Sequence, residues 1–223
     1  MECTRTAYRP MPRQMPIARE GFPFIAIALF AVLAAWMMRA DLVAAAMVLV
    51  AAFVVFFFRN PRRRTPQGEG LVVAPADGRV IRVERGVPAP HTARPSTKVS
   101  IFMSVLNVHV NRLPVTARVK EAVYRSGKFF VASLDKDCEH NEQSALVLID
   151  GAGREYVVVQ IAGLIARRIV CYLREGDSCT AGERFGLIRF GSRLDVYMPP
   201  EAAVAVELGA RTRAGETVIG RFE

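Results

Sequence analysis

Residues that usually hold metal ions or exchange protons near neutral pH are scarce in this sequence. The 223 residues include three histidines, His91, His109 and His140. There are four cysteines, Cys3, Cys138, Cys171 and Cys179. The cysteines form no C-x-x-C pair and have no spacing typical of metal ligands. We therefore expect no metal site, and we expect the cysteines to be structural thiols in a reducing compartment.

Acidic residues are fewer than basic ones, 21 against 30, which gives a formal net charge of +9. Most of the positive charge comes from arginine. Such a charge suits a phosphate-rich partner, either a nucleic acid or the anionic face of a bilayer. The sequence contains no helix-turn-helix, zinc-finger or RNP-like pattern, and its arginines cluster around the most apolar part of the chain. We therefore expect a lipid surface as the partner and no nucleic acid.

Long amphipathic helices are missing after Phe58, but two long apolar runs precede that point. They span residues 21–38 and 42–58 and are separated only by Arg39-Ala40-Asp41. Neither run carries a charge, so together they predict a helical hairpin in a membrane. Each run is near the lower end of the roughly 17–25 residues that span hydrocarbon. A full crossing, which we favour, and a shallower re-entrant wedge both fit this length.

Arginines flank the hairpin on both sides. By the positive-inside rule, they place both flanks, and with them the rest of the protein, on the cytoplasmic side of the cell membrane. A cleaved signal peptide fits less well, because the first run starts late, is followed by a second run and lacks a small-residue cleavage site. The flanking residues are Arg5, Arg9, Arg13 and Arg19 before the hairpin and Arg59, Arg62, Arg63 and Arg64 after it.

The composition divides the chain into a basic N-terminal segment (1–20), the membrane hairpin (21–58), a basic linker (59–70) and a folded domain (71–223). The linker combines proline with arginine, which suits a segment lying against lipid headgroups. The domain contains short β-branched runs separated by turns, which indicates a mainly β fold of the sandwich or barrel-like type. The expected strands cover residues 71–73, 80–83, 99–103, 117–124, 145–149, 156–161 and 204–206.

Two glycine-punctuated segments, residues 176–188 and 209–221, form an internal repeat. In each, a glycine is followed five positions later by Ala-Gly-Glu and then by an apolar stretch. Glycines at these offsets allow tight turns with positive φ, as in small sandwiches or barrels.

The pattern is also similar to that of biotinyl and lipoyl carrier domains, so a membrane-tethered binding module without catalysis is an alternative. Such a carrier needs a lysine in its turn, and residues 176–221 contain none.

Three short segments contain residues that could carry chemistry, and each also has an ordinary structural interpretation. Asp77 lies in A-P-A-D-G-R-V, where Asp-Gly is a common turn. His109 in N-V-H-V-N-R is a candidate base, although a histidine in a strand is more often a structural residue. Gly191 and Ser192 in F-G-S-R could form a turn and nothing more.

Taken together and in this order, the three segments resemble the phosphatidylserine decarboxylase family in its short, archaeal-type (type A) form. The similarity extends from about Asn60 to the C-terminus and includes Asn141-Glu142 and residues 160–169. Longer bacterial members have L-G-S-T at the cleavage point, where F-G-S-R in this chain fits the short form. They also have a second histidine three residues before the motif histidine, where this chain has Leu106. A substrate contact by a second histidine is therefore not carried over.

The resemblance implies that the chain is a proenzyme that cuts itself. The Ser192 hydroxyl would attack the carbonyl carbon of Gly191, and elimination would leave a large chain (1–191) and a small chain (192–223) as a heterodimer, which could assemble further into a homo-oligomer. Ser192 would become a pyruvoyl group, so no external cofactor and no metal is required. His109 would take the serine proton and Asp77 would orient the histidine, because a serine hydroxyl is a weak nucleophile without a base. Gly191 suits the cut because glycine tolerates a strained backbone.

The resemblance also implies the reaction. The pyruvoyl carbonyl derived from Ser192 would form a Schiff base with the amine of phosphatidylserine and withdraw the electrons released as CO₂ leaves, giving phosphatidylethanolamine. His109 would have a secondary role in returning a proton to the product carbon. Another serine-headgroup lipid is the close enzymatic alternative. Arg112, Arg167 and Arg168 stay open between phosphate contacts and surface charges.

Overall fold

The computed structural model describes residues 15–127, 141–163, 169–189 and 191–222. The described residues form two compact units, one that ends at Arg62 and one that starts at Arg63. Several residues considered above lie outside the described ranges, namely Cys3, Arg5, Arg9, Arg13, Cys138, His140, Arg167, Arg168 and Phe190.

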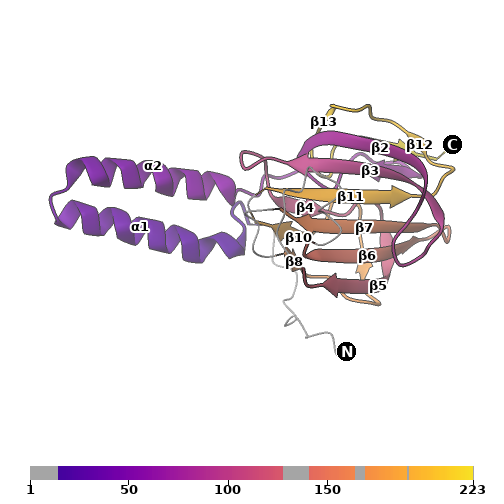
Figure 1. Ribbon diagram of the computed structural model, residues 1–223, viewed down its shortest axis with the longest axis horizontal. Coiled ribbons are helices and arrows are strands. Elements are labelled where there is room, and N and C mark those ends of the chain that lie inside the picture. Colours follow the sequence, from indigo (N-terminus) through magenta and orange to yellow (C-terminus); the bar gives the residue numbers. More distant parts are fainter. Residues whose placement is uncertain (1–14, 128–140, 164–168, 190, 223) are drawn as a thin grey trace. The chain divides into compact units, whose positions relative to one another are not determined.

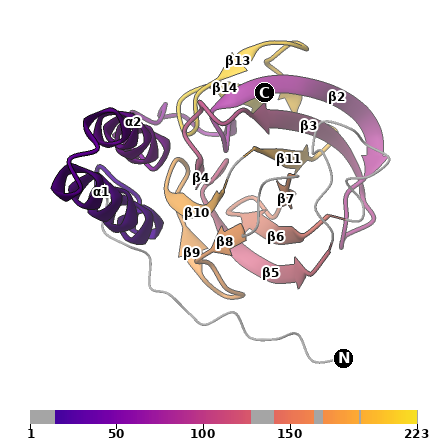
Figure 2. The same ribbon diagram turned by 60° about the vertical axis from the view of Figure 1, so that its left-hand side comes forward.

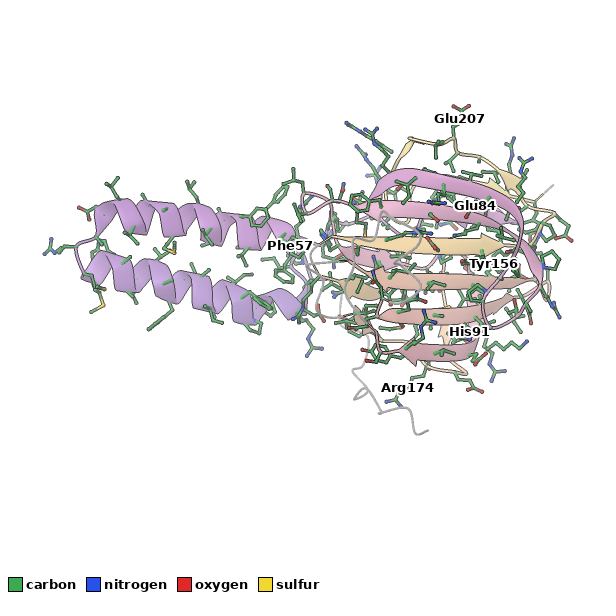
Figure 3. All side chains as sticks on the ribbon, viewed as in Figure 1. Phe57, Glu84, His91, Tyr156, Arg174 and Glu207 are labelled. Carbon is green, nitrogen blue, oxygen red and sulfur yellow. The ribbon has the colours of Figure 1, made fainter. Side chains whose placement is uncertain are left out.

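The first unit is a pair of apolar helices, as the two apolar runs predict. Helix α1 (Phe22–Met37) follows a short 3₁₀ turn, η1 (Arg19–Gly21), and lies beside α2 (Asp41–Phe57) in both ribbon views (Figures 1 and 2). The segment Arg19–Met37 is long and apolar enough to cross a membrane, whereas α2 has 17 residues. Large apolar side chains project from both helices along their length (Figure 3) and are well exposed. A helix pair in water would hide such side chains on one face, so this surface suits lipid.

The open end of the helix pair is closed by local contacts. The rings of Phe24 and Phe58 stack with their centroids 5.5 Å apart. The backbone amide of Ala18 donates to the carbonyl oxygen of Phe58 at 2.8 Å, and the side-chain amide of Asn60 donates to the carbonyl oxygen of Met15 at 2.8 Å. The two ends of the hairpin therefore pair their backbone polar groups with each other, which apolar surroundings require.

The second unit is mainly β and is built around an eight-stranded antiparallel sheet that curls into half a barrel (Figure 2). Strands β4, β10 and β8 lie across the open side of the curl. The large sheet contains, in order, β13 (Arg211–Thr212), β2 (Gly78–Pro88), β3 (Pro95–Met103), β11 (Ser192–Met198), β7 (Glu155–Ala162), β6 (Gln143–Asp150), β5 (Ala117–Arg125) and β9 (Ser178–Cys179). The two three-stranded sheets are β4 (Val110–Arg112), β10 (Arg184–Ile188) and β8 (Ile169–Cys171), and β1 (Leu71–Val73), β14 (Val218–Arg221) and β12 (Ala203–Val204).

Strand β11 shows where the core lies, because its side chains alternate between the two faces of the sheet. Leu194, Val196 and Met198 belong to the main apolar core inside the curl. Arg193 and Asp195 point to the opposite face, where both are still buried. A strand buried on both faces at the middle of the sheet is held in register on each side.

The two glycine-punctuated segments make corresponding turns. Gly182 and Gly215 have φ values of 77° and 74°, which few other residues adopt. Their amides donate to the carbonyl oxygens of Leu113 and Ala74, each at 2.8 Å. A Cβ on Gly215 would lie 3.2 Å from the Cα of Gly182, so the two turns touch. Strands β9 and β13, which precede these turns, add to opposite edges of the large sheet.

Gly186 lets β10 pack closely against β8 and against the side chain of Gln160 on β7. A Cβ at this position would overlap the carbonyl oxygen of Val170 and lie 2.9 Å from the side-chain nitrogen of Gln160.

We expect Gly186→Ala to lower the free energy of unfolding by about 1–3 kcal/mol, because the added methyl forces β8 or Gln160 to move. Thermal and urea unfolding in detergent measure the change. Gly151→Ala is the matched control, because a Cβ there meets nothing within 4 Å and Gly151 has no positive φ, and equal effects of the two substitutions would contradict this account.

Candidate cleavage and active site

Ser192 is the first residue of β11 and lies between two strands. It pairs with Met103 on β3 and with Ala162 on β7. Its side chain faces the interior of the curl, as that of Leu194 does two residues later, and the residue is fully buried. Within the described part of the chain, its hydroxyl oxygen has no hydrogen-bond partner. A buried hydroxyl without a partner is unusual and marks a reactive or ligand-binding position.

Gly191 places the backbone for this serine. Its φ is +67°, in the left-handed region where a side chain is strained. A Cβ at Gly191 would meet nothing within 4 Å, so the backbone conformation requires glycine here and the available space does not. The amide of Gly191 donates to Nε2 of His109 at 3.3 Å.

His109 is fully buried and its tautomer follows from its two neighbours. Nδ1 lies 3.0 Å from the carbonyl oxygen of Asn107, which can only accept, so Nδ1 carries the proton. Nε2 faces the Gly191 amide, which can only donate, so Nε2 presents its lone pair. These two contacts therefore place the Nε2 lone pair of His109 against the backbone amide of Gly191, the residue before Ser192.

The turn before His109 orients it, which the sequence analysis did not foresee. The side-chain oxygen of Asn107 accepts hydrogen bonds from the amide of Ser104 at 2.9 Å and from its hydroxyl at 2.7 Å. These bonds fix the turn whose carbonyl group holds Nδ1 of His109. The spacing of Ser104 and Asn107 is typical of a local side-chain-to-backbone turn and could have indicated this support.

Asp77 lies in the turn before β2 and is engaged elsewhere. Its carboxylate accepts two hydrogen bonds from Arg63, at 2.7 and 2.9 Å, and one from the amide of Ala214 at 2.8 Å. Among the described residues no hydrogen bond joins Asp77 to His109. The structure thus brings His109 to the backbone amide of Gly191, one residue before Ser192, but it does not bring Asp77 to the histidine.

Arg63 belongs to a cluster of charges around Asp77. Arg63 also contacts Glu216 at 3.2 Å, and the amide of Arg64 donates to Glu216 at 3.0 Å. The bond from the Arg64 amide, together with the Arg63 guanidinium, holds the pKa of Glu216 below its usual range. This carboxylate therefore contributes stability at neutral pH, and the contribution is lost on acidification through its lowered pKa. The cluster fixes the start of the second unit to the turn that carries Asp77.

Arg112 is a buried structural residue in this fold. It donates to the carbonyl oxygen of Gly182 at 2.8 Å and is 4% exposed. Burial, reinforced by the nearby Arg63 guanidinium, lowers the pKa of Arg112. Of the two interpretations left open for Arg112, a solvated surface charge is wrong, because the side chain is buried against the glycine turn.

A buried pair of charges follows Ser192 directly. Arg193 forms two bonds with Asp195, at 2.7 and 2.9 Å, and a third with the hydroxyl of Ser100 at 3.2 Å. Removing one partner of a buried ion pair typically costs about 3–5 kcal/mol. The bond from Arg193 to Ser100 joins β11 to β3 and therefore opposes a slip of one strand against the other, which would move Ser192 away from His109.

The described cysteines are poor candidates for the nucleophile. Burial raises the pKa of both Cys171 and Cys179 to about 11. At neutral pH both are protonated thiols, which are weak nucleophiles. Ser192, with a buried hydroxyl that has no partner among the described residues, is the better candidate.

Comparison with known proteins agrees with this site. The family model described as phosphatidylserine decarboxylase matches residues 50–220. The phosphatidylserine decarboxylase proenzyme of Syntrophus aciditrophicus is 48% identical over 92% of this chain and 97% of its own length. The proenzymes of Citrifermentans bemidjiense and Geobacter sulfurreducens are 52% and 53% identical, each over 92% of this chain and 96% of their own length. The family model covers the last part of α2 and the β unit up to Gly220, and the chain therefore belongs to the phosphatidylserine decarboxylase family.

Proposed function

We propose that the chain cuts its own backbone between Gly191 and Ser192 and that Ser192 becomes the pyruvoyl group of the mature enzyme. As a member of its family the chain is a phosphatidylserine decarboxylase, a pyruvoyl-dependent carboxy-lyase. The observation that carries the assignment of Ser192 is its buried, unpartnered hydroxyl, one residue after the Gly191 amide that faces His109. The short, archaeal-type subtype is part of the proposal and rests on the F-G-S-R sequence.

The proposed cleavage moves atoms as follows. The Ser192 hydroxyl attacks the carbonyl carbon of Gly191 while Nε2 of His109 takes its proton, and the histidine then returns this proton to the departing amide nitrogen. The peptide bond is thereby replaced by an ester. Loss of the Ser192 Cα proton breaks the ester C–O bond and releases Gly191 as a carboxylate. The remaining N-terminal dehydroalanine takes up water and loses ammonia, which leaves the pyruvoyl group.

The surroundings of residue 192 suit a decarboxylase. The pyruvoyl group supplies a carbonyl that captures the substrate amine and accepts the electrons released as CO₂ leaves. The side chains of Met103 and Ala162 lie on either side of residue 192, on the same face of the sheet. Such apolar neighbours disfavour a buried carboxylate charge and therefore favour its conversion to neutral CO₂.

Asp77 has a proposed role that requires a change of partner. We propose that it assists His109 during cleavage once its bonds to Arg63 are released. Arg63 lies in the basic linker 59–70, which is expected to contact lipid headgroups. Lipid phosphates would compete with Asp77 for the guanidinium, because Arg binds phosphate and carboxylate in the same bidentate way.

The remaining sequence-based assignments extend this proposal. The chain is anchored through residues 21–58, with residues 1–20, the linker and the domain 71–223 on the cytoplasmic side. The large chain 1–191 and small chain 192–223 stay together after the cut. The corresponding turns at Gly182 and Gly215 support the interpretation of the two glycine segments as copies of one unit.

Intact-mass analysis tests the cleavage. We expect the purified wild type to contain two chains that divide after Gly191, the small one lighter than its sequence by one ammonia. Ser192→Ala should stay whole, because alanine has no hydroxyl to attack the peptide bond, and Ser178→Ala, at an exposed serine, should mature normally. A wild-type chain that stays whole would reject the proposal and favour the tethered binding module.

The role of His109 is tested by the rate of self-cleavage after cell-free synthesis. We expect His109→Ala to slow cleavage by about 10²–10⁴-fold, because general base catalysis contributes a factor of this size. Added imidazole should restore part of the rate. His91→Ala is the control, since His91 is exposed, and a His109 variant that cleaves at the wild-type rate would remove the histidine from the scheme.

Asp77 is tested by a pair of substitutions. If Asp77 assists His109, Asp77→Asn should slow cleavage by about tenfold or more, because a neutral amide stabilises the histidine cation less. Arg63→Gln should leave the rate unchanged or raise it, because it frees the carboxylate. Equal rates for both variants and the wild type would assign Asp77 to the turn alone.

A further inference from the structure

Two buried carboxamides lie inside the curl of the sheet. Gln160 on β7 and Asn111 on β4 are both fully buried. Nε2 of Gln160 donates to Oδ1 of Asn111 at 2.8 Å, and the amide of Asn111 donates to the sulfur of Met103 at 3.6 Å. Because Asn111 uses its nitrogen toward Met103, it offers its oxygen to Gln160. This chain of bonds turns the oxygen of Gln160 away from Asn111.

The oxygen of Gln160 is left without a partner. Within the described ranges, no donor reaches Oε1, although the side chain is 0% exposed. Buried polar atoms nearly always have a hydrogen-bond partner, since an unpaired one loses its hydration without compensation. An acceptor held in this way therefore indicates the place where a donor arrives.

The pair lies beside residue 192. Met103, which contacts Asn111, is directly opposite Ser192 on β3. Gln160 is two residues before Ala162, the other neighbour of Ser192, so both face the same side of β7. Such diagonal neighbours have backbones about 7–8 Å apart, within reach of a long side chain.

The fold holds Gln160 in one position. Gly186 has no side chain where Nε2 of Gln160 lies, and a Cβ there would come within 2.9 Å of it. Asn111 fixes the same nitrogen from β4. Asn111 is also two residues after His109, so one short segment carries both the histidine that faces Gly191 and the amide that orients Gln160.

We propose that Oε1 of Gln160 accepts a hydrogen bond from the amino nitrogen of the substrate headgroup where that nitrogen reaches residue 192. The proposal rests on the assignment of residue 192 as the reacting group. A serine-phosphate headgroup offers a carboxylate, a phosphate and an amine, and only the amine can donate. Gln160 therefore selects primary amines and orients the nitrogen toward the reacting carbon.

The test measures covalent capture of an amine and needs no decarboxylation. Mature enzyme is mixed with short-chain phosphatidylethanolamine or its N-methyl derivative and reduced with borohydride. The amine joins residue 192 with loss of one water, and hydride plus a proton complete the reduction. The mass of the chain that begins at residue 192 gives the captured fraction. After joining, the protonated Schiff base of a primary amine has one N–H for Gln160, whereas the iminium ion of the N-methyl amine has none.

We expect the wild type to capture the primary amine about tenfold faster or more, since a hydrogen bond to a charged group is worth this factor. Gln160→Met, which has a similar shape and no acceptor, should capture both amines within about threefold of each other. Gln160→Glu should keep the preference, because a neutral carboxyl donates to Asn111 and still presents an oxygen. Ser144→Ala is the matched control, because Ser144 lies opposite Gln160 on β6.

The intact mass of each preparation is measured first. A wild-type protein that does not cut itself contradicts the assignment of residue 192 as the reacting group, whereas the role of Gln160 is tested only on mature enzyme. A mature wild type that captures both amines within about twofold overturns the role of Gln160, because the bond would then be worth little. A mature Gln160→Met enzyme that keeps the wild-type preference overturns it as well. If the methionine does not fit the site, Gln160→Leu provides a second acceptor-free variant for the same comparison.

Discussion

The pairing of β11 with β3 on one side and β7 on the other is the constraint on which the site depends. Ser192 is the first residue of that strand, so the register of the strand decides which side chains surround its hydroxyl. A slip by one residue would turn Ser192 out of the core and Arg193 into it. The buried bond from Arg193 to Ser100 on β3 opposes such a slip. The geometry of the candidate site and the stability of the sheet therefore depend on the same hydrogen-bond ladder.

The turn that carries Asp77 has a counterpart in the other half of the domain. Comparing the two turns distinguishes the role of Asp77 as a hydrogen-bond acceptor in the turn from the role of its negative charge. Asp77 accepts the amide of Ala214 at 2.8 Å, and the hydroxyl of Thr116 accepts the amide of Ala181 at 3.0 Å. The segments A-P-A-D-G-R-V and L-P-V-T-A-R-V correspond around these two positions. A neutral oxygen is thus sufficient to cap the turn. The charge of Asp77 is a separate feature, and in this structure it binds Arg63.

Much of the fold follows from local sequence patterns. The expected strand 71–73 coincides with β1, and five of the other expected strands lie within β2, β3, β5, β6 and β7. The last, 204–206, overlaps β12 only at Val204. Strand β11 was not expected, because Gly191 and Ser192 at its start favour a turn, although charged and apolar residues alternate from Arg193 to Val196 as in a strand. The burial of its two charged residues depends on the tertiary fold. The other unexpected strands, β4, β8, β9, β10, β13 and β14, have two to five residues, too few for a clear pattern.

Site residues that belong to a recognisable motif could be predicted from the sequence. Contacts between residues from distant segments could not. The N-V-H-V-N-R segment identified His109, but its tautomer depends on Asn107 and Gly191. Gln160 and Asn111 are 49 residues apart, and sequence position alone does not show that they meet. The pairing of Asp77 with Arg63 was also not expected, because the linker was assigned only to the lipid surface.

The central position of β11 also explains in physical terms why the protein is made as one chain. A separate polypeptide ending at Gly191 would leave β3 and β7 with two facing rows of unpaired amide and carbonyl groups, and such open edges promote aggregation. A nick at the first residue of an already inserted strand creates no open edge. The two products are already paired when the cut is made, so they need no collision to find each other.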